Sequence, residues 1–171
     1  MGVLVVAFFA TLIGFVLILW MGKNTPVHPA AMVSGAGTGE LDWVRGFGIE
    51  GFQRLVILLF AEMGFAVEKS DRSSETVDVL AVDSTPIRGA RVSIHGLWSP
   101  PLGIVGADEV RSMLDASRAE FVGKGILLTL GGFSEDARAE ARGTPVDLID
   151  GEALAKLVKK VLPQVYAQKK I

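Results

Sequence analysis

The residues best suited to chemistry lie between Thr76 and Trp98, where two apolar stretches flank a polar turn. This pattern predicts a β-hairpin. Asp78 lies early on the first predicted strand, whereas His95 and Leu97 share one face of the second, because side chains two residues apart point the same way. A carboxylate and an imidazole on adjacent strands could hold a divalent metal ion. Asp78 and His95 are therefore the candidate metal ligands.

The composition narrows the classes of function. The chain has 171 residues, which allows one domain and an appendage. It contains no cysteine, and this excludes disulfides, thiolate zinc sites and a cysteine nucleophile. His28 and His95 are too far apart in sequence to form a histidine-based metal motif. With a net charge of −2, the chain lacks the overall basic character of many nucleic-acid binders.

The segment from Gly2 to Gly22 contains no charged residue. A run of about 20 apolar residues is long enough to cross a bilayer, and Trp20 suits an interfacial position. Because no Lys or Arg precedes the run, a transmembrane anchor over residues 1–22 fits better than a cleaved signal peptide. Lys23 follows at once, so the positive-inside rule predicts a single-pass protein of a bacterial-type inner (plasma) membrane with its C-terminal domain in the cytoplasm.

Two further segments complete the predicted organisation. Residues 23–40 are rich in Gly, Pro and Ala and are typical of a flexible linker. Residues 41–171 form the predicted folded domain. Within the predicted anchor, Ala10 and Gly14 have the spacing of small residues by which two helices can pack, so a homo-oligomer is one candidate assembly.

Apolar periodicity predicts an α/β domain. Helical spacing predicts a helix over 50–63, and the hairpin is preceded by a predicted strand over 65–70. The remaining prediction is a helix over 108–121, a strand over 125–130, a helix from the cap Ser134 to about residue 142, a strand over 146–149 and a helix after the cap Asp150. Meandering strands followed by β-α alternation indicate a mixed central sheet of about five strands flanked by helices.

Two segments carry a resemblance to a known family. The segment GKGILLTLGGFSEDARAEARGTPVDLIDGEALAKLV, residues 123–158, and the segment GFQRLVILLFAEMGFAVE, residues 51–68, resemble the Mrr-like (type IV) restriction endonuclease domain. This domain is a branch of the PD-(D/E)XK nuclease superfamily. The resemblance covers roughly Gly48 to Lys160. It implies a restriction-endonuclease-like fold, with the predicted transmembrane helix added at the N-terminus.

The resemblance also implies an active site that this chain only partly retains. Family members use a divalent ion, usually magnesium, to hydrolyse DNA. They need an acid on the first helix, an aspartate on the second strand and Gln-x-Lys on the third. By position, these residues fall on Gln53, Asp78, His95 and Leu97. Asp78 alone is retained, which indicates a degenerate catalytic site.

The leading functional hypothesis is a non-catalytic domain that binds DNA weakly, or a protein partner, at the membrane. This function needs no cofactor, and the sequence does not assign the DNA-contacting residues. One alternative is an active endonuclease, dependent on Mg²⁺ or Mn²⁺, whose displaced site would use Glu68, Glu75 or Asp83. The other is a membrane scaffold that makes no contact with nucleic acid.

Overall fold

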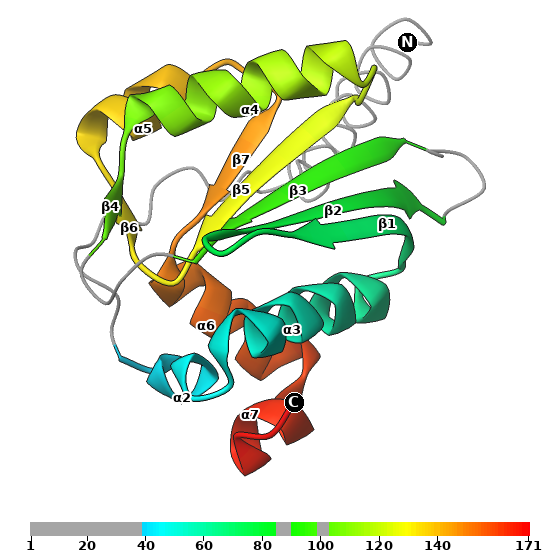
Figure 1. Cartoon of the computed structure of the whole chain (residues 1–171), viewed down its shortest axis with the longest axis vertical. Coiled ribbons are helices and arrows are strands. Elements are labelled where there is room, and N and C mark those ends of the chain that lie inside the picture. Colours follow the sequence, from blue (N-terminus) through cyan, green and yellow to red (C-terminus); the bar gives the residue numbers. More distant parts are fainter. Residues whose placement is uncertain (1–38, 85–89, 99–102) are drawn as a thin grey trace, which may run out of the picture. The chain divides into compact units, whose positions relative to one another are not determined.

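A five-stranded mixed sheet forms the centre of the domain (Figure 1). The computed structural model describes residues 39–84, 90–98 and 103–171. The strand order is β1-β2-β3-β5-β7. The first three strands pair antiparallel, and β3, β5 and β7 pair parallel. This arrangement confirms the prediction of a mixed five-stranded sheet.

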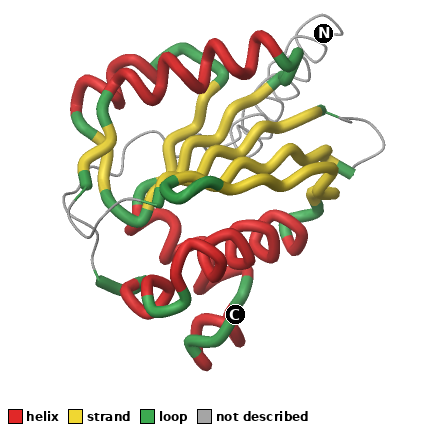
Figure 2. Tube along the Cα trace, viewed as in Figure 1, coloured by secondary structure: helices red, strands yellow, loops and turns green. Residues whose placement is uncertain are grey.

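The strands and helices occupy most of the described chain (Figure 2). The strands of the sheet are β1 (Phe65–Arg72), β2 (Thr76–Asp83), β3 (Arg91–Leu97), β5 (Lys124–Thr129) and β7 (Val146–Ile149). The helices are α2 (Asp42–Arg45), α3 (Gly48–Glu62), α4 (Ala107–Ala119), α5 (Glu135–Ala141), α6 (Gly151–Val161) and α7 (Pro163–Gln168). A second, two-stranded sheet joins β4 (Ile104–Val105) to β6 (Gly132–Phe133).

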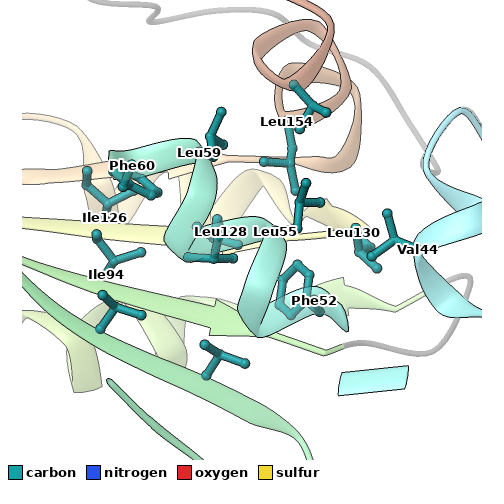
Figure 3. Packing of buried hydrophobic residues seen from close by; sticks show 14 of the residues in the cluster. Val44, Phe52, Leu55, Leu59, Phe60, Ile94, Ile126, Leu128, Leu130 and Leu154 are labelled. Carbon is teal, nitrogen blue, oxygen red and sulfur yellow. The ribbon is translucent and has the colours of Figure 1, made fainter. Parts of the chain in front are cut away.

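Helices cover the sheet on both faces (Figure 1). On one face, α3 and α6 enclose the larger apolar cluster. Figure 3 shows Phe52 and Leu59 of α3 and Leu154 of α6 packed over Ile94 and Leu128 of the central strands. On the other face, α4 and α5 enclose a smaller cluster. The central strand β5 is apolar over residues 126–128 because both of its faces are covered.

Capping side chains explain why two of the predicted helices begin where they do. The backbone N–H of Ala137 donates to Ser134 Oγ at 3.1 Å, which caps α5. The N–H of Ala153 donates to Asp150 Oδ1 at 2.9 Å, which caps α6. The second oxygen of Asp150 accepts from Arg138 at 3.2 Å, so this buried carboxylate ties α5 to α6.

The glycine after Asp150 is required by a close backbone approach. A Cβ atom on Gly151 would lie 2.3 Å from the carbonyl oxygen of Leu130, far inside contact distance. The Gly151 N–H donates to the Gly131 carbonyl at 2.8 Å, which holds the start of α6 against the end of β5. The Asp-Gly pair is therefore structural, because it caps a helix and permits tight packing.

Three features of the fold go beyond the sequence prediction. The short helix α2, the β4–β6 pair and the helix α7 were not predicted. The predicted helix after Asp150 ends at Val161, because Pro163 disfavours helical backbone at Leu162, and Pro163 begins α7 instead. Strand β1 also continues two residues beyond its predicted end, to Arg72.

The predicted membrane anchor over 1–22 lies outside the described residues, as does almost all of the predicted linker over 23–40. Within the part of the chain that the structure describes, no helix has the length and apolarity needed to cross a bilayer. Residues 34–171 form one compact unit. The sheet, both apolar clusters and every described helix belong to this unit.

Candidate functional site

A cleft of about 390 Å³ lies between α4 and the exposed face of β1, β2 and β3. Helix α4 covers β5 and β7 and leaves the first three strands partly open on this face. The polar residues that line the cleft are Lys69 and Asp71 of β1, Asp78 of β2, Ser93 and His95 of β3, Glu109 and Ser112 of α4, and Glu120 just after α4. The cleft therefore brings together titratable groups from three strands and from the α4 region.

Asp78 and His95 are direct neighbours in the cleft. They face each other across the β2–β3 ladder, and His95 Nδ1 donates a hydrogen bond to Asp78 Oδ1. The His95 side chain is 23% exposed and that of Asp78 is 55% exposed. This hydrogen bond is the main reason that the pKa of Asp78 lies below its ordinary value, and partial burial opposes the shift. Asp78 is therefore a carboxylate held in its ionised form.

Two residues of β1 that the sequence analysis did not identify extend this group. Asp71 lies directly opposite Asp78 in the β1–β2 ladder. Lys69 shares the same face and forms an ion pair with Asp71, with an Nζ–Oδ2 distance of 2.5 Å. The Asp71 carboxylate raises the pKa of Lys69, so this lysine remains a cation. The cleft thus holds a lysine, although it comes from the first strand and not the third.

An irregularity in β1 explains why the sequence did not predict Lys69 and Asp71 as residues of the cleft. The strand register shifts between Val67 and Lys69. Before the shift, Phe65 and Val67 pack toward the larger apolar cluster. Regular alternation would place Lys69 and Asp71 on that same apolar side. The extra residue turns the side chains of Lys69 and Asp71 to the opposite face of the sheet. No local sequence pattern predicts such a bulge.

Leu97 stands one step beyond His95 on the same face of β3. Its side chain is 9% exposed and belongs to the smaller apolar cluster. Its neighbours in that cluster include Val105, Val110, Leu127 and Phe133. The position on which the resemblance predicted the family lysine to fall is therefore part of the hydrophobic core under α4.

Gln53 lies on the opposite side of the sheet from the other three predicted site residues. It belongs to α3, and its Nε2 donates to Ser70 Oγ at 2.7 Å. Its Oε1 accepts from Arg72 at 3.2 Å. Asp78 points away from α3, because the alternate residues Val77 and Val79 are buried in the α3 cluster. The structure therefore brings Asp78, His95 and Leu97 together on one face and leaves Gln53 apart.

The three acids considered for a displaced site do not line the cleft. Glu68 pairs with Arg91 at 3.0 Å. Glu75 lies in the turn between β1 and β2, and Asp83 ends β2 five residues beyond Asp78. A displaced site built on these acids has no support in the described geometry. Asp71 is the additional carboxylate that the fold places beside Asp78.

The described residues do not fit the family's metal centre. Across residues 39–84, 90–98 and 103–171, no group of three or more His, Asp or Glu side chains is arranged to hold a metal ion. Leu97 is a buried apolar residue, and the Asp78 carboxylate already accepts a hydrogen bond from His95. The two predicted metal ligands, Asp78 and His95, are instead hydrogen-bonded to each other.

Comparison with known proteins identifies the fold and the family. Residues 44–158 match the Mrr_cat family, described as restriction endonuclease. The match covers about two thirds of the sequence, so the chain belongs to this restriction endonuclease family. No curated protein sequence matches the chain.

Solved structures of restriction endonucleases share this fold. The DNA modification-dependent restriction endonuclease AspBHI aligns over 78% of the chain with a TM-score of 0.52 and 16% identity. MspJI, solved in complex with a 27-mer oligonucleotide, aligns over 82% with a TM-score of 0.50 and 21% identity. The alignments cover 38% of AspBHI and 36% of MspJI, so the chain spans well under half of either protein.

Proposed function

We propose that this chain is a catalytically inactive member of the restriction endonuclease family that binds DNA weakly at a membrane. The observation that carries the proposal is the position of Leu97. A leucine in the place of the family lysine is packed among Val110, Leu127 and Phe133 instead of facing a reacting phosphate. Nothing at this position can stabilise charge or transfer a proton.

The loss of function expected from these replacements is large. Removal of a positioned acid–base group costs on the order of 10²–10⁴ in rate. Loss of a preorganised electrostatic group costs about 10²–10³. The amide of Gln53 supplies no charged ligand and contacts Ser70 on the other side of the sheet. Either loss by itself would leave a very slow enzyme.

DNA is the proposed ligand because MspJI, which shares the fold, was solved with an oligonucleotide. The binding is expected to be weak, because four carboxylates face one lysine in the cleft. This excess of negative charge repels phosphate. Contacts with the DNA backbone would then come from basic residues outside the cleft, and log affinity should fall linearly with log salt. A protein partner is the alternative ligand.

The proposed location rests on the sequence of the N-terminal segment. Residues 2–22 carry no charge, and Lys23 follows them. A single-pass anchor with the domain on the cytoplasmic side of a bacterial-type inner membrane accounts for both features. Full-length protein should then remain with the membrane fraction after carbonate washing and enter solution only with detergent.

A second candidate is a working endonuclease with a relocated site. The observation that favours it is the position of Asp71 and Lys69 beside Asp78 in the cleft. Magnesium sites commonly use one or two carboxylates together with water and substrate phosphates. In this second candidate, Asp71 would replace the missing acid and Lys69 the missing lysine.

A plasmid-nicking assay with Mg²⁺ or Mn²⁺ separates the two candidates. The inactive domain should leave supercoiled DNA intact under both conditions. Nicking that disappears in Asp78→Ala and Asp71→Asn, but persists in Asp115→Asn on the outer side of α4, would replace the first candidate by the second. Asp115 is a matched control because its carboxylate is exposed and pairs with Arg118 away from the cleft.

A fluorescence-anisotropy titration with a duplex oligonucleotide tests the proposed ligand. Measurable binding at low salt that weakens steadily as salt is added supports DNA. If no binding is detected even at low salt, DNA is excluded as the ligand, and the protein partner takes its place.

A further inference from the structure

We infer that the surface formed by α6, α7 and the C-terminal residues, together with the outer side of α3, docks on an anionic lipid bilayer. This inference rests on the membrane attachment proposed above, and it adds an orientation for the domain. The surface is called the lysine face below. Its basic residues Lys159, Lys160, Lys169 and Lys170 are all exposed.

Charge is divided between the two helical layers of the domain. Helices α2, α3, α6 and α7 with the residues after α7 carry seven basic and four acidic side chains. Helices α4 and α5, on the other face of the sheet, carry three basic and six acidic side chains. The cleft adds carboxylates to the acidic side. An anionic surface therefore attracts one layer of the domain and repels the other.

The lysine face is continuous across elements that are distant in sequence. Lys159 Nζ of α6 lies 5.7 Å from the centre of the Tyr166 ring of α7. A Cβ atom on Gly51 of α3 would lie 3.6 Å from Ile171 Cδ1, so the end of the chain lies against α3. Lys169 and Lys170 directly precede this contact. Two acidic side chains of these helices are neutralised by ion pairs. Glu152 of α6 pairs with Lys156, and Glu50 of α3 pairs with Arg72.

Exposed apolar side chains distinguish this face from a simple basic patch. Phe47, at the start of α3, is 44% exposed, and Leu58 is 40% exposed. Phe47 and Leu58 are eleven residues apart, which places them on the same side of the helix, with Arg54 between them. Apolar side chains among lysines are typical of surfaces that lie in the headgroup region of a bilayer.

The point at which the chain enters the domain lies on this face. The Tyr166 hydroxyl donates to Glu40 Oε2 at 3.5 Å, so the start of the described chain is beside α7. Docking through the lysine face would leave the acidic cleft open on the far side of the domain from the lipid (Figure 1).

Vesicle flotation of the fragment Ser34–Ile171 tests the inference, because this fragment contains the complete sheet and both apolar clusters but not the predicted anchor. The vesicles are phosphatidylcholine alone, or phosphatidylcholine with phosphatidylglycerol. The fragment should float with the phosphatidylglycerol vesicles and stay behind with phosphatidylcholine alone. Each lysine replaced by glutamine should lower the partition coefficient about fivefold. The variants are Lys159→Gln with Lys160→Gln, and Lys169→Gln with Lys170→Gln.

The matched control removes two positive charges from the opposite layer. Arg111→Gln with Arg118→Gln on α4 should leave flotation unchanged, because both arginines are on the acidic side. The inference is overturned if the fragment does not float with phosphatidylglycerol vesicles, or if the α4 variant loses flotation as much as the lysine variants. It is equally overturned if the lysine variants lose affinity for duplex DNA but keep their affinity for vesicles. None of these results depends on DNA cleavage or on carbonate washing of the full chain.

Discussion

The replacement Leu97→Lys introduces the residue type that the family resemblance predicts at this position, and it tests whether the position is part of the core. In the wild type, Leu97 is 9% exposed and packs under α4. The new ammonium group would enter a cluster of aliphatic and aromatic side chains. It must lose its proton, remain unpaired at a high cost, or reach a carboxylate.

The expected loss follows from the geometry. Exposure of a buried leucine side chain costs about 1.5–3 kcal/mol. Leu97 pairs with Thr76, so Asp78 is its diagonal neighbour on β2, at about 7–8 Å between Cα atoms. A lysine side chain can span this distance and pair with Asp78, which limits the penalty for the charge. We therefore expect Leu97→Lys to lower the free energy of unfolding by about 2–4 kcal/mol.

Urea denaturation of the fragment Ser34–Ile171, followed by far-ultraviolet circular dichroism, measures this loss. Leu97→Met is the matched control, and it should cost less than about 1.5 kcal/mol because it conserves volume and polarity. Addition of Asp78→Ala to Leu97→Lys should cost more than Asp78→Ala alone, because the ammonium loses its partner. A Leu97→Lys variant as stable as the wild type would refute the argument and show that the cleft extends under α4.

Two further predictions concern Asp78 and Phe121. Because the His95 hydrogen bond holds the folded-state pKa of Asp78 below its ordinary value of 3.8, ionised Asp78 stabilises the fold above that pH, and the benefit is lost as pH falls through the lowered pKa. Asp78→Asn should therefore lower the urea midpoint near neutral pH and have a smaller effect in acid; an equal effect at every pH would contradict the assigned cause. Phe121 follows α4 in the left-handed region, with a φ of 53°, and its side chain is 93% exposed. Because glycine adopts this backbone conformation without strain, Phe121→Gly should stabilise the fragment by about 1 kcal/mol. Gly143 has a φ of 74°, so Gly143→Ala should destabilise the fragment. A less stable Phe121→Gly variant would show that the ring makes a contact that stabilises the fold.

The sequence alone determined most of the elements of this domain. The predicted helix over 50–63 is observed as Gly48–Glu62, and the predicted strand over 146–149 is observed with the same bounds. These elements were predictable because burial on one side imposes a period of 3.6 or 2 on the local sequence. The caps Ser134 and Asp150 were predictable for a similar reason, since a cap acts within three residues of its own position.

The tertiary structure decided which side chains share a site. The sequence placed Asp78 and His95 on neighbouring strands, but the register of the β1–β2 ladder brought Asp71 opposite Asp78. A bulge after Val67 turned Lys69 into the same cleft, against the local alternation. The position of α3 on the far face kept Gln53 away from Asp78. Register, bulges and layers depend on pairing between segments far apart in the chain, so no local pattern of residues could determine them.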